Sequence, residues 1–435
     1  MQKSRVKVGI LGLGTVGGGV ARLLLQEKDR LSSLLGAELV LAKAVDLDQA
    51  LAAEAGIPSD LFHKEASAVL KDPEIDIVVE LIGGLEPART FVLEAIAGGK
   101  QVATANKALL ARHGAEIYRA ARSGRVSVAF EAAVGGGIPL IRSLRDGLCA
   151  NRITNCLGIL NGTCNFILTR MTSQGAPFAQ VLQEAQAQGL AEADPTFDVE
   201  GIDTAHKLAI VASLVTGAHP ALADIPTEGI TRLTPLDIQF AGEFGFVVKL
   251  LALLRNEGGQ VQARVHPALV PRSHVLASVD GAFNALHLSG DWVGDVLLYG
   301  LGAGRRPTAS AVVGDIVDLA RDLVTGCPGR VPPLGRAKDP GGQLKLAPLA
   351  RVSCKYYFRF TAQDKPGVLA AISRILGEHK ISIEAVIQKG RTSEEGPVPI
   401  VMLTHEAKEA SVRQALKAID DLAVISEPTM LIRMA

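Results

Sequence analysis

The sequence predicts an α/β protein with a parallel, doubly wound sheet at its N-terminus and a small α+β module at its C-terminus. A glycine-rich turn joins an apolar strand to a helix near the start of the chain. Strand-like and helix-like runs then alternate through the first third of the sequence. The final segment, 351–435, has the order strand, helix, strand, strand, helix, strand. These observations predict a Rossmann-type dinucleotide-binding domain, an α+β middle domain and a ferredoxin-like βαββαβ domain.

Composition narrows the class of partner. Lysine plus arginine and aspartate plus glutamate each total 45, so no net charge attracts nucleic acid or an anionic membrane. We expect small molecules and copies of the same chain as partners. The five cysteines are an odd number without zinc-site spacing, so we expect free thiols in a reducing compartment.

The N-terminus has some features of an export signal. Lys3, Arg5 and Lys7 precede an apolar run, but glycines interrupt that run and no small-residue cleavage site follows. Other apolar stretches fall short of the ~20 residues that span a membrane. We therefore expect a cytoplasmic protein that does not enter a membrane.

The glycine-rich turn predicts a dinucleotide site. It follows an expected strand at 6–11 and precedes an expected helix at 20–26. Glycines allow a tight turn and a close approach to a pyrophosphate, whose charge is favoured at the helix N-terminus. The candidate cofactor contacts are Gly12, Gly14, Thr15, Val16 and Gly17.

A second strand, Glu38 to Val45, ends at Asp46, which favours NAD because a carboxylate binds the ribose 2′-hydroxyl and repels a 2′-phosphate. Asp46 lies further from the last glycine than the usual ~20 residues, and Lys43 is within reach of a phosphate, so NADP stays open.

Two further strands are expected at 75–81 and 101–104, with a helix at 90–97 between them. Ligands of doubly wound sheets bind at the carboxyl ends of the strands. Gly83 and Lys107 follow these ends and are candidate site residues, although a lysine considered alone is more often simply solvated.

A glycine run at 132–139 follows the apolar segment 126–131. Either the backbone packs tightly there or its carbonyls face a ligand or cation. A second glycine cluster, 300–304, precedes a helix expected at 309–324, which we expect to close back on the first domain.

The most informative segment is an acidic loop, 194–206, that runs into Lys207. Leu208 to Thr216 is almost wholly apolar and predicts a buried helix, and Asp203 lies one turn before the lysine. An ordinary i,i+4 ion pair and a catalytic lysine are both compatible with this spacing. His206 points about 100° away from its neighbour on a helix and is expected to be structural.

Prolines and glycines at 326–350 predict a linker. Beyond it, we expect strands at 351–361, 382–388, 398–405 and 423–432, and helices at 367–378 and 410–419. The first turn either holds an amino acid's polar groups against backbone N–H donors or is only a tight turn. Its candidate ligand residues are Asp364, Pro366, Gly367, Val368 and Leu369.

Several motifs in order resemble the homoserine dehydrogenase family, and the tail resembles an ACT domain. The family likeness covers nearly all of residues 1–325, with one departure at Leu301, where proline is common. The residues that carry it include Gly12 to Gly17, Thr104 to Lys107, Glu131 to Pro139, Asn161 to Thr163, Ala185 to Lys207, Gly302 to Gly304 and Pro307 to Ala311.

The resemblance implies hydride transfer between L-homoserine and L-aspartate 4-semialdehyde with NAD or NADP. Lys207 would relay the proton and Lys107 would polarise the reacting oxygen, with the two roles exchangeable, and Asp203 would lie beside them. Glu192 would receive the substrate ammonium, and Asp198 would line the pocket.

The resemblance also implies a monovalent cation, sodium or potassium, at Glu131 and the carbonyls of Val134, Gly136 and Ile138. Thr163, Gly302 and Gly304 fall where cofactor contacts are expected. The ACT domain implies an amino-acid effector, with L-threonine favoured over methionine or isoleucine, and a homodimer or homotetramer.

Four parts are expected on this basis. They are a dinucleotide-binding domain at 1–140 with about 305–325, a substrate-binding, catalytic and dimerisation domain at 141–304, the linker at 326–350 and the ACT domain at 351–435. Two alternatives remain: another NAD(P)-dependent dehydrogenase of an amino acid or semialdehyde, and a non-catalytic sensor of amino acids and nucleotides.

Overall fold

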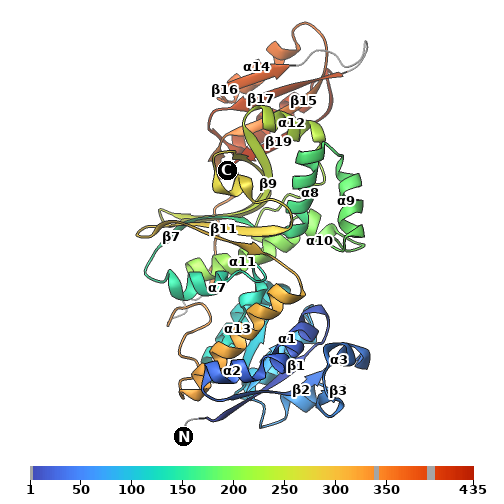
Figure 1. Ribbon diagram of the computed structural model, residues 1–435. Helices are drawn as coiled ribbons and strands as arrows, with labels where there is room; N and C mark the ends of the chain where they lie inside the picture. The colour runs from blue at the N-terminus through green and yellow to red at the C-terminus, as the bar shows by residue number, and fades with distance from the viewer. Residues whose placement is uncertain (1–2, 338–341, 389–396) are drawn as a thin grey trace. The chain divides into compact units, whose positions relative to one another are not determined.

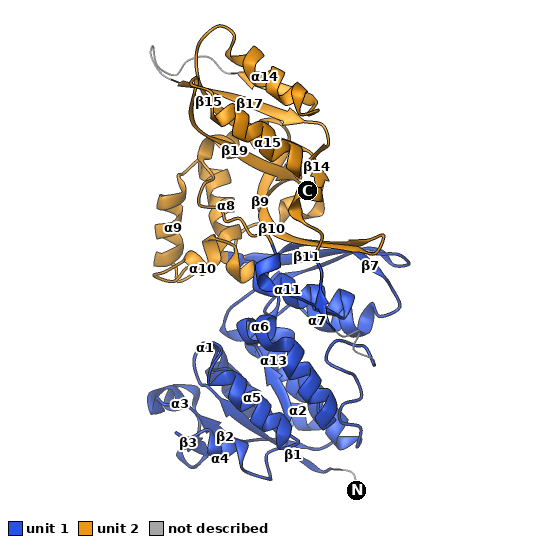
Figure 2. Ribbon diagram, turned by 180° about the vertical axis from the view of Figure 1, so that it is seen from behind, with its two compact units in different colours: residues 1–162, 205–225, 283–345 blue, residues 163–204, 226–282, 346–435 orange. Residues whose placement is uncertain are grey.

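The computed structural model describes residues 3–337, 342–388 and 397–435. The chain forms two compact units (Figure 2). The first comprises 1–162, 205–225 and 283–345, and the second comprises 163–204, 226–282 and 346–435. Within the described ranges, no helix combines the length and apolarity needed to cross a membrane.

A six-stranded parallel sheet forms the base of the first unit, in the order β3-β2-β1-β4-β5-β6. The strand order reverses between β1 and β4, which is the switch point where doubly wound sheets bind ligands. The expected Rossmann-type sheet is confirmed. The strands are β1 (Arg5–Leu11), β2 (Glu38–Val45), β3 (Phe62–His63), β4 (Ile77–Glu80), β5 (Gln101–Thr104) and β6 (Val128–Ala129).

Helices cover this sheet, and the last of them returns from far along the chain. Helix α13 (Arg305–Val324) lies beside α1 (Thr15–Gln26), and its residues Val312 and Ile316 share a core with the sheet (Figure 1). The other helices are α2 (Lys28–Leu35), α3 (Gln49–Ala55), α4 (Ser67–Leu70), α5 (Ala88–Ala97) and α6 (Lys107–Gly124).

Helix α1 begins at Thr15, earlier than the expected start at Val20. The glycines that suggested a longer turn lie inside the helix because the packing has no room for a side chain. A Cβ on Gly17 would overlap the Gly12 carbonyl oxygen, and one on Gly19 would lie 3.2 Å from the Cβ of Ala309 in α13.

The first unit also contains an antiparallel group in the order β12-β11-β7. Its strands are β7 (Ile153–Ile159), β11 (Phe283–Gly290) and β12 (Gly294–Leu301), and the short helix α7 (Leu140–Arg142) precedes them. Helix α11 (Ile202–Thr216) contributes all but its first residues to this unit.

The second unit contains α9 (Phe178–Ala187), α10 (Thr196–Val199), α12 (Pro235–Glu243) and most of α8 (Gly162–Gln174). A long antiparallel hairpin joins β9 (Phe246–Glu257) to β10 (Gln260–Pro271). The last strand of the chain, β19, pairs in parallel with β10 through Ala268 and Arg433.

The C-terminal module, residues 351–435, has the strand order β19-β15-β17-β16, and its first and third strands are central. The expected ferredoxin-like class is confirmed. Its elements are β15 (Tyr356–Gln363), α14 (Val368–Glu378), β16 (Ile383–Gln388), β17 (Pro397–Thr404), α15 (Glu409–Asp420) and β19 (Ile425–Met434).

Two expectations near this module need correction. The strand expected at 351–361 is broken: a 3₁₀ turn, Leu349–Arg351, and a two-residue strand, β14 (Ser353–Cys354), precede β15. The expected linker is also more ordered than its composition suggests, because β13 (Gln343–Leu344) pairs with β8 (His219–Pro220). Pro340 and Gly341, which contributed to the linker prediction, lie outside the described residues.

Candidate active site

The glycine turn after β1 has the geometry of a pyrophosphate site. Gly12 has φ +94°, and a Cβ there would lie 2.7 Å from the Leu81 carbonyl oxygen, so glycine is required. A Cβ on Gly14 would meet open space. Helix α1 follows with Thr15 and Val16, without a side-chain cap or an acidic residue in its first turn. Its N-terminal N–H groups therefore face a position suited to an anion.

Asp46 lies beside this turn. Its Oδ2 accepts a hydrogen bond from the Leu13 N–H at 2.6 Å, and its Oδ1 accepts one from the Asp48 N–H at 3.0 Å. These bonds hold the carboxylate at the end of β2, next to the glycine turn, where a ribose is expected.

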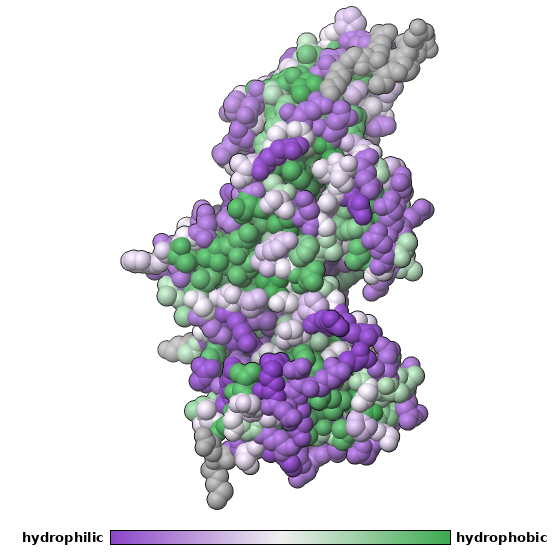
Figure 3. All heavy atoms as spheres, in the orientation of Figure 1, coloured by the Kyte–Doolittle hydropathy of each residue, from purple (hydrophilic) through white to green (hydrophobic). Residues whose placement is uncertain are grey.

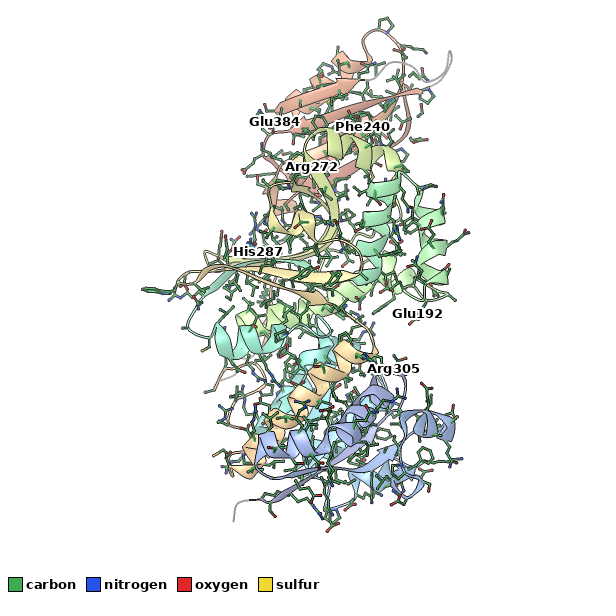
Figure 4. The ribbon with its side chains drawn as sticks, in the orientation of Figure 1. Glu192, Phe240, Arg272, His287, Arg305 and Glu384 are labelled. Carbon is green, nitrogen blue, oxygen red and sulfur yellow. The ribbon has the colours of Figure 1, made fainter. Side chains whose placement is uncertain are left out.

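Two arginines that sequence spacing did not indicate also lie near the turn. They line a hollow of about 240 Å³ with Leu13 and Gly14. Arg22 Nη2 donates to the Glu54 carbonyl at 2.5 Å, and Arg305 Nη1 lies 3.0 Å from Glu54 Oε1. Figure 4 shows Arg305 at the N-terminal end of α13.

A buried network joins the ends of β4 and β5. Glu80 is fully buried, and its carboxylate accepts hydrogen bonds from the Thr104 hydroxyl at 2.6 Å and the Gly83 N–H at 3.1 Å. Asn106 Oδ1 accepts from the Leu109 N–H at 3.0 Å, and its Nδ2 donates to the Gly84 carbonyl at 2.8 Å. The network fixes the turn from which Lys107 starts α6.

The two glycine clusters meet each other. A Cβ on Gly136 would overlap the Gly302 carbonyl oxygen, and one on Gly137 would lie 2.8 Å from Pro307. Tight packing, one of the two interpretations of this run, therefore requires glycine at Gly136 and Gly137. Gly304 has φ +113° and immediately precedes α13. Val134 and Ile138 are buried, and the Ile138 carbonyl accepts from the Leu140 N–H at 2.7 Å.

Glu131 shares a buried cluster with Asp315 of α13. Glu131 accepts hydrogen bonds from the backbone N–H groups of Ile141 at 2.6 Å and Arg142 at 3.0 Å. Asp315 accepts from the Glu131 N–H at 2.8 Å and from Arg142 Nη2 at 2.9 Å. Burial and the charge of Asp315 raise the pKa of Glu131 to about 7, and burial raises the pKa of Asp315 to about 6.

Lys207 is buried, with 9% of its surface exposed, and its Nζ donates to the Leu160 carbonyl at 2.6 Å. Helix α11 begins at Ile202 rather than at the expected Leu208, so Asp203 and Lys207 lie one turn apart on one helix. Asp203 is 1% exposed. Lys107, the other candidate catalytic residue, is half-buried in the same unit as Lys207.

The expected substrate residues lie in the second unit. Glu192 is exposed in the loop before α10 (Figure 4), and Asp198 is half-buried in α10. The Thr163 hydroxyl donates to the Leu190 carbonyl at 2.7 Å, and the Cys164 thiol donates to the Asp198 carbonyl at 3.2 Å. Helix α8 therefore contacts the chain just before the acidic loop, at Leu190, and within it, at Asp198.

The turn before α14 retains the features of a ligand turn. Gly367 has φ +90°, and a Cβ there would meet open space. Helix α14 begins at Val368 without a side-chain cap, which leaves its first N–H groups for a ligand or water. Leu369 is 39% exposed beside it. Asp364 and Pro366 complete the turn.

Over the residues that the structure describes, no group of three or more histidine, cysteine, aspartate and glutamate side chains could hold a metal ion. All five cysteines are free thiols.

Comparison with known proteins decides the family. A family model described as homoserine dehydrogenase matches residues 139–317, and its NAD-binding domain matches 12–131. A homoserine dehydrogenase of Neisseria gonorrhoeae is 44% identical over 99% of this chain and 98% of its own length. The chain belongs to the homoserine dehydrogenase family. The resemblance drawn from its motifs is confirmed, and this is a family of oxidoreductases that act on a CH–OH group.

Other relatives agree. The homoserine dehydrogenase of Pseudomonas aeruginosa is 45% identical over 99% of this chain and 98% of its own length. The crystal structure of a homoserine dehydrogenase from Thiobacillus denitrificans has a TM-score of 0.93 and 45% identity, and covers 100% of this chain and 99% of that chain. An ACT domain model matches residues 356–424, which confirms the expected ACT domain.

The sequence did not indicate the residues that support this site. Glu80 carried one signal, since it is an acidic residue at the end of an apolar strand, as Asp46 is. Asp315 and Arg305 carried none, because they reach the site from a helix far along the chain.

Proposed function

We propose that this protein catalyses reversible hydride transfer between L-homoserine and L-aspartate 4-semialdehyde with NAD(P). The observation that carries the proposal is Lys207, a buried lysine whose Nζ is held by the Leu160 carbonyl one helical turn from the buried Asp203. Burying two ionisable side chains at a helix start is costly, which favours a functional over a purely structural role.

Oxidation of the hydroxyl requires a base that removes its proton. We assign that role to the neutral amine of Lys207, which becomes an ammonium when it takes the proton, with Lys107 as the donor that polarises the reacting oxygen and Asp203 as the carboxylate that keeps the lysines oriented. Glu192 binds the substrate ammonium, and Asp198 lines the pocket. When bound, the nicotinamide cofactor supplies the hydride acceptor.

For the cofactor, we propose contacts from Gly12, Gly14, Thr15, Val16, Gly17, Gly83, Lys107, Thr163, Gly302 and Gly304. Asp46 favours NAD, since its carboxylate is fixed beside the glycine turn. Arg22 and Arg305 line a hollow near the same turn, and arginines can bind the 2′-phosphate of NADP, so NADP remains the alternative cofactor. A hyperthermophilic archaeal homoserine dehydrogenase in complex with NADPH is 26% identical, with a TM-score of 0.62, and covers 72% of this chain and 97% of that chain.

We also propose a monovalent cation, sodium or potassium, near Glu131. Two buried carboxyl groups lie beside one guanidinium, that of Arg142, whose Nε is 3.7 Å from Glu131 and whose Nη2 donates to Asp315 at 2.9 Å. When both carboxyl groups are ionised, one negative charge remains for a cation to compensate. The carbonyls of Val134, Gly136 and Ile138 would supply further oxygen ligands.

A homodimer or homotetramer is supported by an apolar face on β12. Leu297 is 41%, Tyr299 53% and Leu301 46% exposed. Figure 3 shows apolar residues gathered where Figure 1 places the neighbouring strands β7 and β11. Exposed apolar patches of this kind mark association surfaces. We also propose L-threonine as the effector that binds the Asp364 to Leu369 turn. The cellular location that we propose is the cytoplasm.

Initial rates of absorbance change at 340 nm test this function. Purified protein with L-homoserine and either NAD or NADP should show turnover, and added L-threonine should suppress it. Turnover of another amino alcohol but not of homoserine would favour a different dehydrogenase. No turnover with either cofactor would favour the sensor.

A further inference from the structure

Two arginines of the C-terminal module bind a carboxylate outside it. Arg433 in β19 is 1% exposed and donates to Glu228 from Nη1 at 2.9 Å and Nη2 at 3.0 Å. It also donates to Glu409 of α15 at 2.6 and 2.9 Å. Arg413 of α15 donates to both Glu409 at 2.8 Å and Glu228 at 2.9 Å. Glu228 is therefore held by a bidentate pair and a second cation.

The segment around Glu228 lies against the acidic loop. The Ile230 N–H donates to the Val199 carbonyl at 2.8 Å, and the Thr231 hydroxyl donates to Glu200 Oε1 at 2.9 Å. The approach is so close that a Cβ on Gly229 would overlap the Val199 carbonyl oxygen.

The acidic loop is confined from this side. Gly201 has φ +78°, and a Cβ there would lie 3.2 Å from the Thr227 Cγ2 methyl. Gly201 is followed directly by α11, which carries Asp203 and Lys207. Along the chain, the turn from Val199 to Gly201 therefore lies between Asp198 and Asp203. The segment 227–231 packs against this turn and hydrogen-bonds to it.

We propose that Glu228 is a positioning residue, through which Arg433 and Arg413 of the C-terminal module fix the Val199–Gly201 turn and hence the Asp198 and Asp203 carboxylates. This inference rests on the proposed function for the meaning of those carboxylates. Small displacements of substrate-positioning groups cost up to ~100-fold in rate, so loss of this grip should weaken use of homoserine without affecting the cofactor domain.

The same module offers a matched control. Arg359 of β15 donates to Asp237 of α12 from Nε at 2.6 Å and Nη2 at 3.1 Å, another bidentate pair. Asp237 is fully buried, whereas the Glu228 side chain is 38% exposed. If both pairs served only stability, Asp237→Asn would be the more damaging change.

Steady-state kinetics of the full-length variants Glu228→Gln and Asp237→Asn separate the two roles. Glu228→Gln should raise the KM for homoserine by about tenfold or more while the KM for the nicotinamide cofactor stays within about twofold. Asp237→Asn should lower the Tm at least as much and leave both KM values within about twofold. The conservative variant Glu228→Asp should recover part of the homoserine KM.

An unchanged homoserine KM in Glu228→Gln, or an equal rise in Asp237→Asn, would overturn the proposal. Arg413→Gln, which removes only the more exposed arginine, replaces Glu228→Gln if that variant does not fold. Hydrogen–deuterium exchange of residues 196–206 gives an answer independent of activity, since exchange should accelerate in Glu228→Gln and not in Asp237→Asn. Wild-type protein that never oxidises homoserine would contradict the proposed function alone.

Discussion

At the scale of single residues, Glu131 and Asp315 are unusual because folding makes their ionisation harder. Their pKa values rise from 4.5 and 3.8 to about 7 and 6, mainly through burial. A carboxyl with a raised folded pKa contributes stability that is fully present below its unfolded pKa and is lost as pH rises through the folded value. Without a compensating cation, the free energy of unfolding should fall as pH rises from about 4 to about 7, and the fall should end above the folded pKa values.

Replacing choline chloride with potassium chloride at equal ionic strength should therefore raise the Tm more at pH 8 than at pH 5. A bound cation favours the ionised carboxylates, and each kcal/mol is worth roughly 2–4 °C for a domain of this size. Calorimetry measures the Tm at each pH, and Glu131→Gln should remove the difference in the potassium effect between pH 8 and pH 5. An equal cation effect at both pH values would rule out this site.

Sequence spacing indicated some site residues and not others, for physical reasons. Lys107 and Asp46 were predictable because each follows the carboxyl end of an expected strand, where ligands bind. The hydrogen bonds that fix the turn before Lys107 were not predictable. The bond from Thr104 to Glu80, for example, depends on how β4 and β5 pair. Glu228 carried no signal, because its importance comes from Arg433, which lies far along the chain.

At the scale of elements, the start of α6 matters most because Lys107 is its first residue. Asn106→Ala should cost about 1 kcal/mol through loss of the cap and should also lower kcat, since the Gly84 bond is lost with it. Denaturant unfolding and initial rates measure the two effects. Thr234→Ala, which removes the cap of α12, is the control and should cost stability without lowering kcat. Equal kcat values in the two variants would contradict this role for Asn106.

The effector turn is another element that a single change can test. Gly367→Ala should abolish threonine inhibition while retaining turnover, because alanine at φ +90° is strained and would shift the turn. Gly377 lies near the end of α14, and a Cβ there would meet nothing within 4 Å, so Gly377→Ala should keep inhibition intact. Inhibition curves in threonine distinguish the variants, and full inhibition of Gly367→Ala would place the effector elsewhere.

Element bounds show where local signals suffice. Strands β2 and β5 have the predicted limits, since each is a mostly apolar run that ends at a polar residue or turn. Helix α11 begins at Ile202, whereas the sequence predicted a start at Leu208. The prediction was late because the first turn of the helix is polar and shows no apolar periodicity. The pairing of β13 with β8 was not predictable from a proline-rich segment, since it depends on a distant partner.

At the scale of the whole molecule, the C-terminal module is not a detachable sensor. Its last strand pairs with β10, and Arg433 and Arg359 bind carboxylates outside it. Removing the module would expose β10 and leave Glu228 and Asp237 without these partners. We therefore expect truncation to impair turnover as well as regulation, so single substitutions are the cleaner test of threonine sensitivity.

The apolar face of β12 makes a prediction about assembly. Leu297→Lys should shift the protein toward the monomer, because a charge in an apolar interface is costly. Light scattering coupled to size-exclusion chromatography measures the mass. Leu47→Lys, at a site 85% exposed elsewhere in the same unit, should leave the mass unchanged. An unaltered mass for Leu297→Lys would remove this face from the interface.

The most direct test of the central claim is kcat for homoserine oxidation by Lys207→Ala. If Lys207 is the proton relay, kcat should fall by at least ~100-fold while the KM for the cofactor changes little. A variant that keeps a tenth of the wild-type kcat would show that Lys207 does not have this role.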